Sequence, residues 1–367
     1  MRKIAILSFF RSANYGAVLQ ALALQVNVNK LGYQSEYLSF EMWEHKFVFR
    51  DIFRFAYNNF VRSWLGFKRR KAKCFKFVDE YLFYSEPLKL SYQIEELEMK
   101  YDGFLVGSDQ VWNPYFYNES NGFYLLDFIY SKPKMSYATS FAVNELPKSL
   151  TQRYKKSLSS FKFLSSRESS GCSIISKLGM SSQNVLDPTL LLNGEEWKKY
   201  FVNAPYSFHY VLCYIMPGDN AIDSLIKEVA CAIGSSFQII IIGDREHKRI
   251  SLKYKYICDV GPSEFLNLMY NAACVVTNSF HGTCFSVNFN KPFYTILNST
   301  NKRNSRVTDL LYSLDLSTQI IYTDIEKQSK IPKCIPELNY RKVNGQLNLL
   351  RKQSLEYLQD SLSLMFD

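Results

Sequence analysis

Apolar positions along the chain follow two different periodicities from its first residues onward. Residues 3–9 form a short apolar run with the length of a buried strand, and residues 15–31 carry apolar side chains at helical spacing until Gly32. Another strand is predicted at 34–40. Because strand, helix and strand in this order are the unit of a parallel sheet, the pattern predicts an α/β fold. Further short strands are predicted in this half at 101–106, 134–138, 161–165 and 184–186.

The pattern starts again after a polar stretch that ends near residue 207. Here strands are predicted at 210–215, 237–242, 274–277 and 293–297, and helices at 221–233, 263–272 and 283–288. The last segment, 345–366, has leucines at helical spacing. A chain of 367 residues exceeds what one hydrophobic core usually supports. We therefore expect two α/β domains facing each other across a cleft, with boundaries at 1–190 and 205–345, and a closing helix at 346–367.

The composition is that of a globular protein. Hydrophobic residues make up 47% of the chain, which excludes a disordered protein. The eight cysteines include no CxxC pair and no histidine lies at ligand spacing, so neither a disulfide framework nor a metal site is expected. No apolar stretch reaches the roughly 20 residues of a membrane-spanning helix, and the N-terminus has the pattern of a strand instead of a signal peptide. We expect a cytoplasmic protein.

Positive charge is concentrated in one segment. Residues 45–77 contain ten Lys or Arg and a single acid, Asp51, out of a net charge of +10 for the whole chain. Because the remainder is close to neutral, a nucleic-acid partner is not expected. Aromatic residues are interleaved with the basic ones, a composition typical of elements that lie on anionic membranes. An equally good interpretation is a solvated basic helix whose aromatic side chains pack on the N-terminal domain.

The clearest chemical signal is the sequence Val-Thr-Asn-Ser-Phe-His-Gly-Thr at 276–283, where a predicted strand turns into a helix. Helix N-termini present free N–H groups and a partial positive charge, which suit a phosphate or carboxylate. His281 could add a proton donor, and Gly282 would let a ligand approach the backbone. Ser279 and Thr283 supply hydroxyl groups at the same turn.

A second candidate is the loop at 9–17, which follows the first predicted strand and also opens a helix. It has only one glycine, Gly16, so it lacks the spacing of a dinucleotide-binding loop. Two interpretations remain open for it. The loop could bind a ligand, or it could be a tight turn in which Asn14 caps the helix.

A third candidate is the loop at 107–114, again at a strand end. Asp109 supplies a carboxylate, Ser108 and Gln110 supply polar groups, and Trp112 supplies an indole ring. Such groups commonly contact sugars. The alternative is that the polar residues cap a turn while Trp112 lies in the core, and the residues themselves do not separate the two interpretations.

Arginines could supply positive charge for an anionic substrate, because the guanidinium fork binds carboxylate or phosphate bidentately. Arg167 directly follows a predicted strand, and Arg303 and Arg306 follow the strand after the histidine helix. Arg245 is a further candidate. Any one of them could equally be a solvated surface residue.

Five segments in this order resemble the polysaccharide pyruvyl transferase family. They are 14–21 (NYGAVLQA), 107–113 (GSDQVWN), 166–168 (SRE), 186–189 (LDPT) and 278–283 (NSFHGT). The resemblance implies a GT-B fold of two Rossmann-like domains, phosphoenolpyruvate as donor, and a donor site that includes His281 and Arg167. Many members carry an acid after the glycine of the first loop, where this chain has Ala17, which weakens any acid–base role there.

The expected reaction is formation of a pyruvate ketal on a sugar of a capsular or exopolysaccharide precursor that is attached to a lipid. His281 would act as the acid, Arg167 and Arg306 would hold the donor, and Asp109 would act as the base for the acceptor hydroxyl. The C-terminal domain is expected on the phosphoenolpyruvate side and the N-terminal domain on the acceptor side. Neither a metal nor a cofactor is expected, since phosphoenolpyruvate is a co-substrate.

Two other classes of function stay open. A nucleotide-sugar-dependent glycosyltransferase of GT-B fold could use the same histidine turn for a nucleoside diphosphate. Alternatively, the basic segment could be the working part of a non-catalytic protein that binds a membrane or nucleic acid. That hypothesis predicts that binding survives the loss of His281.

Overall fold

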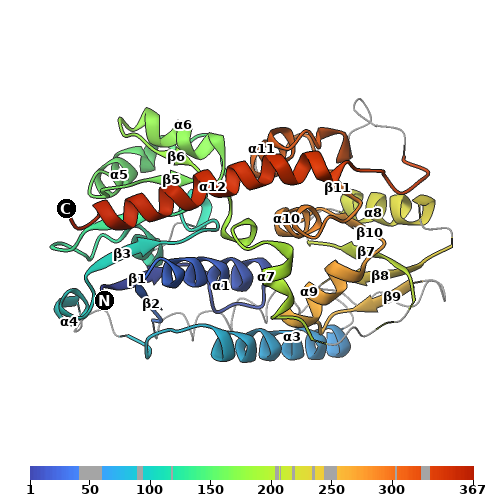
Figure 1. Cartoon of the computed structure of the whole chain (residues 1–367), viewed down its shortest axis with the longest axis horizontal. Helices are drawn as coiled ribbons and strands as arrows, with labels where there is room; N and C mark the ends of the chain where they lie inside the picture. The colour runs from blue at the N-terminus through green and yellow to red at the C-terminus, as the bar shows by residue number, and fades with distance from the viewer. Residues whose placement is uncertain are drawn as a thin grey trace.

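The computed structural model is an α/β protein with two parallel sheets, shown in Figure 1. Its described residues are 1–40, 60–88, 94–116, 119–202, 206, 208–216, 220–233, 236–243, 254–301, 304–323 and 331–367.

The N-terminal half contains a parallel four-stranded sheet of order β2-β1-β3-β4. Its strands are β1 (Lys3–Leu7), β2 (Gln34–Tyr37), β3 (Gly103–Val106) and β4 (Lys134–Ser136). The short pair β5 (Ser165–Ser166) and β6 (Gln183–Asn184) continues next to β4 through isolated parallel bridges. Functional candidates at 8–16, 107–114 and 167 therefore all leave from the carboxyl ends of neighbouring strands, as parallel sheets require of their ligand-binding loops.

Helix α1 (Tyr15–Lys30) follows β1 and is buried on nearly all sides. It contacts α3 (Phe60–Tyr81) and, in the other half of the molecule, α9 (Pro262–Asn271). The hydroxyl of Tyr15 donates a hydrogen bond to the carbonyl of Val260, 2.9 Å away. Because α1 touches both halves, its first turn lies between them. The other helices of this half are α4 (Ile94–Lys100), α5 (Lys148–Leu158), α6 (Ser169–Lys177), η1 (Pro114–Phe116) and η2 (Glu119–Leu125).

The C-terminal half contains a six-stranded parallel sheet of order β12-β11-β10-β7-β8-β9. Its strands are β7 (Tyr210–Tyr214), β8 (Gln238–Ile242), β9 (Tyr254–Ile257), β10 (Cys274–Thr277), β11 (Phe293–Leu297) and β12 (Ile320–Tyr322). Its helices are α8 (Asn220–Ile233), α9, α10 (Phe280–Asn288) and α11 (Ser305–Ser313), with η4 (Ser317–Gln319) before β12. The predicted elements of this half are confirmed, whereas β9, β12 and α11 were not predicted. Between the two sheets lie η3 (Pro188–Leu190) and α7 (Gly194–Lys198).

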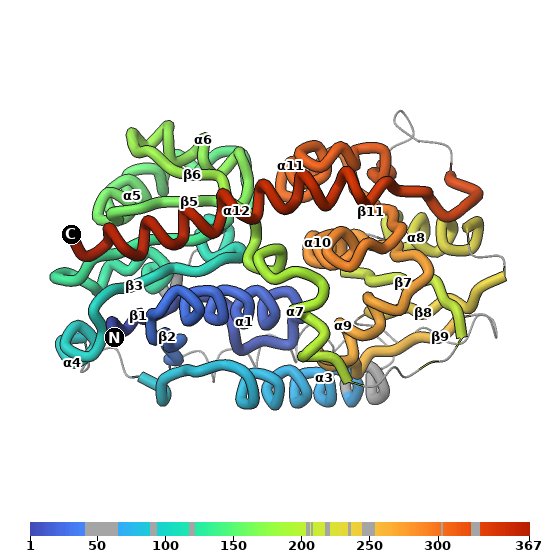
Figure 2. The backbone as a smooth tube through the Cα atoms, in the orientation of Figure 1, coloured from blue at the N-terminus to red at the C-terminus, as the bar shows by residue number. Residues whose placement is uncertain are grey.

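The closing helix α12 (Tyr340–Leu364) runs along both halves, as Figure 2 traces in red. It begins five residues earlier than the predicted 345. At its start the hydroxyl of Tyr340 donates to the carbonyl of Lys291 in the C-terminal half. Farther along, Ser354 Oγ accepts a hydrogen bond from the amide of Leu186 at 2.9 Å, and the hydroxyl of Tyr357 donates to the carbonyl of Ser136. The helix therefore joins the two halves.

The described part of the basic segment belongs to α3; residues 45–59 lie outside the described residues. Cys74, Phe77 and Val78 of α3 are buried in the core. Lys73 forms an ion pair of 2.6 Å with Glu264 in the other half of the molecule. This portion of the segment thus packs on the protein's own body. None of the helices among the described residues is long and apolar enough to span a membrane.

Candidate functional site

Two helix N-termini from different halves of the molecule meet at one point. Asn14 caps α1 by accepting a hydrogen bond from the amide of Ala17, and Ser279 caps α10 by accepting one from the amide of Gly282. A Cβ on Gly16, in the first turn of α1, would collide with the imidazole ring of His281 in the first turn of α10. Only a glycine at position 16 allows the two helices this contact. The partial positive ends of both helices therefore lie next to His281.

His281 is 7% exposed and its two ring nitrogens have different surroundings. Nε2 is buried without a hydrogen-bond partner and lies 3.6 Å from Oδ2 of Asp187. Nδ1 is on the side of Gly16. A buried polar atom without a partner costs free energy, so its presence at a helix N-terminus points to a functional constraint.

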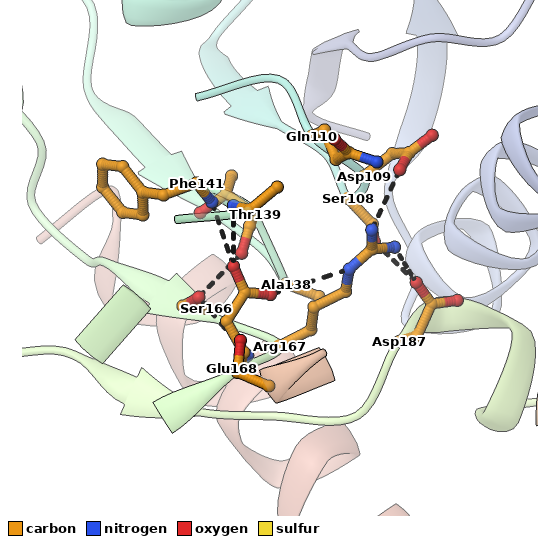
Figure 3. Close-up of polar contacts among 12 residues, drawn as sticks. Ser108, Asp109, Gln110, Ala138, Thr139, Phe141, Ser166, Arg167, Glu168 and Asp187 are labelled. Atoms are coloured by element: carbon orange, nitrogen blue, oxygen red, sulfur yellow. Dashed lines mark hydrogen bonds and ion pairs between the residues drawn. The ribbon is translucent and has the colours of Figure 1, made fainter. Parts of the chain in front are cut away.

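Arg167 is surrounded by three carboxylates, as Figure 3 shows for Asp109, Asp187 and Glu168. Its Nη1 lies 2.6 Å from Oδ2 of Asp187, its Nη2 lies 2.9 Å from Oδ1 of Asp109, and its Nε lies 3.9 Å from Oε2 of Glu168. The arginine side chain is completely buried. Its guanidinium carbon is 4.5 Å from the centre of the Phe280 ring, which precedes the histidine. The free fork expected of a substrate clamp is thus occupied, and a substrate anion would have to displace a carboxylate.

Burial and charge act in opposite directions on this cluster. Burial alone would raise the pKa of Asp187, but His281 and Arg167 outweigh it and hold that pKa well below its usual range. At Asp109 burial is likewise outweighed by Arg167, His281 and Arg306, so its pKa is lowered. Burial dominates at Glu168 and raises its pKa in spite of Arg167. Asp109 and Asp187 are therefore anionic at neutral pH.

Asp187 is held by four donors. Its Oδ1 accepts hydrogen bonds from the amide of Thr189 at 3.0 Å and from Oγ1 of Thr189 at 2.8 Å. Its Oδ2 accepts from Arg167 and, at 3.0 Å, from Oγ of Ser108. In the sequence, Asp187 is recognisable only as part of the family pattern, and no role was predicted for it. An Asp-Pro-Thr triplet after a strand is the signal that could have found it, because such an Asp caps a turn.

Asp109 has a left-handed backbone conformation with φ of 74°. This conformation is uncommon outside glycine and is tolerated best by Asn and Asp. The carbonyl of Asp109 accepts hydrogen bonds from the amides of Val111 and Ser140, which fix the turn. The carboxylate is directed at Arg167, and 12% of the side chain remains exposed. Strained backbone of this kind is concentrated at functional sites.

The structure brings most of the predicted site residues together and leaves others apart. Gly16, Ser108, Asp109, Arg167 and His281 form one cluster through the contacts above. Asn14 and Ser279 cap the two helices that meet there. The guanidinium of Arg306, on α11, lies 5.7 Å from the centre of the Phe280 ring. Arg303 lies outside the described residues.

Four of the predicted site residues make contacts only within the protein's own fold: Trp112, Gln110, Thr283 and Gly282. Trp112 is completely buried, packs on Phe141 and Phe161, and donates its indole N–H to the carbonyl of Tyr124. It is therefore placed as a core residue and does not present a face to a sugar.

The other three are held by local contacts. Gln110 accepts a hydrogen bond from the side chain of Asn113. Thr283 is buried and donates to the carbonyl of Ser279. A Cβ on Gly282 would lie 2.6 Å from Oγ1 of Thr277, so this glycine permits close packing against β10.

Comparison with known proteins gives one family and one fold. A model of the polysaccharide pyruvyl transferase family matches residues 14–300. No curated protein matches the chain in sequence.

Among solved structures, a protein assigned as a UDP-N-acetylglucosamine 2-epimerase from Listeria monocytogenes is 9% identical with a TM-score of 0.54, covering 98% of this chain and 90% of that one. The UDP-GlcNAc 2-epimerase from Neisseria meningitidis is 10% identical with a TM-score of 0.51, and the match covers 97% of this chain and 93% of that one. A variant of the O-GlcNAc transferase from Thermobaculum terrenum is 10% identical with a TM-score of 0.52, and the match covers 100% of this chain and 67% of that one. At such identities the likeness shows the fold alone, which is the predicted GT-B arrangement of two Rossmann-like domains.

Proposed function

Because the chain belongs to the polysaccharide pyruvyl transferase family, we propose that it transfers a pyruvyl group from phosphoenolpyruvate to a sugar of a capsular or exopolysaccharide precursor. The product is a pyruvate ketal, and inorganic phosphate is released. The observation that carries the proposal is the meeting of two helix N-termini at His281. That meeting supplies what an enol phosphate with a carboxylate requires, namely positive potential and a proton donor in one place.

The proposed reaction begins with proton transfer from His281 to the methylene carbon of phosphoenolpyruvate. A sugar hydroxyl then attacks the resulting cationic carbon and gives up its proton. A second hydroxyl of the same sugar displaces phosphate and closes the ketal ring. Asp109 is the proposed base for an acceptor hydroxyl, supported by its anionic state and by the 12% of its side chain that remains exposed.

Positive charge around the donor would come from several groups. The N-termini of α1 and α10 offer N–H groups to the phosphate or carboxylate. Arg306 brings a further charge next to the Phe280–His281 pair, whose rings are 5.2 Å apart. Arg167 would act mainly through Asp109 and Asp187, because its fork is already occupied by those carboxylates.

A thermal-shift experiment tests this proposal against a nucleotide-sugar glycosyltransferase. That second candidate is supported by the fold, since the Neisseria meningitidis structure of the same fold contains UDP-GlcNAc. Phosphoenolpyruvate at a hundred times its Kd should stabilise the native protein by about 2.7 kcal/mol. The stabilisation should vanish in His281→Ala. Stabilisation by UDP-sugars, without any effect of phosphoenolpyruvate, would favour the glycosyltransferase instead.

We also propose that the enzyme works in the cytoplasm and reaches a lipid-linked acceptor by peripheral contact with an anionic membrane. Support comes from the basic residues of α3, among which Lys68 and Lys76 are exposed. The protein should float with vesicles that contain anionic lipid at low salt and should be released at high salt. If it stays with the unbound fraction at low salt, the membrane contact is ruled out.

A further inference from the structure

The two ring nitrogens of His281 face different groups and therefore have different roles in proton transfer. Nε2 is closed off from solvent and lies 3.6 Å from Oδ2 of Asp187. Nδ1 packs against Gly16 in the first turn of α1. Because Nε2 faces Asp187, Nδ1 is the ring nitrogen that remains for a substrate held at the helix N-termini.

Asp187 is built to stay fixed and charged. Four hydrogen bonds from Thr189, Ser108 and Arg167 hold its two oxygens in place, and Oδ2 also faces Nε2 of His281. The segment that carries it is fastened to α10, because Asn288 donates to the carbonyls of Thr189 and Leu192. A movement of about 0.6 Å would bring Nε2 of His281 within ordinary hydrogen-bond distance of Oδ2.

Among the residues that the structure describes, few charged groups face His281. Besides Asp187 they are Asp109 and Arg167, which come from the strand ends of the N-terminal sheet, and Arg306 on α11. The first turn of α1 carries no acidic residue. Among these groups Asp187 is the carboxylate that lies against the buried nitrogen. A buried N–H without an acceptor is costly, so a proton on Nε2 is best accommodated opposite this oxygen.

We propose that Asp187 is a positioning residue that keeps a proton on Nε2 of His281, so that Nδ1 is the nitrogen that passes a proton to the substrate. The assignment of Nδ1 to proton transfer rests on the proposed function. The effect of Asp187 on the proton at Nε2 does not rest on the proposed function. It follows from the geometry of the free protein, and the two parts can therefore fail separately.

Nitrogen NMR of labelled histidine tests the inference directly. The chain has four histidines, and the signal that disappears in His281→Gln identifies the one of interest. In the native protein at a pH where the ring is neutral, the proton should be on Nε2. Asp187→Asn removes the negative charge that faces Nε2. The neutral ring should therefore lose its preference for a proton on Nε2, and the form protonated on Nδ1 should become detectable.

Thr189→Val is the matched control. It removes the Oγ1 donor to Asp187 with almost no change of shape and keeps the carboxylate. The proton of the neutral His281 ring should stay on Nε2 in this variant. If the enzyme transfers pyruvate, kcat should fall in Asp187→Asn and stay near the native value in Thr189→Val.

Two results would overturn the inference. One is a folded Asp187→Asn protein whose neutral His281 still carries its proton on Nε2. The other, which needs no folded Asp187 variant, is a neutral native His281 that carries its proton on Nδ1. Failure of the pyruvyl transfer assay alone would contradict the proposed function and leave the link between Asp187 and His281 standing.

Discussion

Replacing His281 with glutamine is expected to lower kcat/KM for pyruvyl transfer by about a hundredfold to ten-thousandfold, the range that a positioned acid typically contributes. The substitution removes the group that can give a proton to the methylene carbon but keeps a polar side chain of similar length. His281 is almost fully buried, yet its Nε2 makes no hydrogen bond. The substitution should consequently change the free energy of unfolding by much less than the activation free energy of the reaction. Phosphate release from phosphoenolpyruvate in the presence of acceptor measures the effect.

His209→Gln is the matched control, because His209 is exposed ahead of β7 and far along the chain from the site residues. Its activity should equal that of the native enzyme. A His281→Gln enzyme that keeps more than a tenth of the native rate would remove His281 from the proton-transfer role and leave it as a packing partner of Gly16.

Replacing Arg167 with leucine is expected to lower the free energy of unfolding by about 3–5 kcal/mol at pH 7. The substitution leaves Asp109, Asp187 and Glu168 without the guanidinium that they share. Removal of one partner from a buried ion cluster costs more than the cluster contributes, because the remaining charges lie in a medium of low polarity. Urea denaturation of both proteins gives the difference.

The pH dependence of this difference has a definite sign. In the native protein the pKa values of Asp109 and Asp187 are lowered, so both contribute stability above their unfolded pKa and lose it as the pH falls. Without Arg167 the two carboxylates accept protons more readily. The gap in stability between native and variant should therefore narrow as the pH falls from 7 to 4.

Arg153→Leu serves as the control for this experiment. Arg153 also pairs with an aspartate, Asp127, but its side chain is 44% exposed. Solvent-exposed ion pairs contribute at most about 1 kcal/mol, so this variant should stay close to the native stability. Equal losses in the two variants would mean that the buried cluster is not what stabilises this region.

The strands were predictable where they are short, apolar and buried on both faces. All five residues of β7 and of β11 are buried, and their sequences are almost entirely apolar. The two strands that were not predicted, β9 and β12, differ from these in burial or in length. None of the residues of β9 is fully buried, and β12 has three residues only, so neither forms an apolar run of sufficient length.

The individual residues of the site could be predicted from the sequence, but the contacts between them could not. Sequence patterns located His281, Asp109 and Arg167 because each follows a buried strand. That Arg167 is enclosed by carboxylates could not be predicted, since these come from positions 109, 168 and 187, which only the fold brings together. The same reason applies to Trp112. The carbonyl that accepts its N–H belongs to a later turn, so the core and sugar-contacting interpretations were equivalent in the sequence.

The contact between Gly16 and His281 constrains how such a protein can change over evolutionary time. The two residues are 265 positions apart and belong to different halves, yet no side chain at 16 fits while the imidazole occupies its place. A lineage that gained a side chain at position 16 would first have to lose the histidine, and with it the proposed chemistry. Exchange of one half between distant homologues would be tolerated only when both of these residues were preserved. The glycine is in this sense as much a requirement of the proposed chemistry as the histidine, although it takes no part in the proposed reaction.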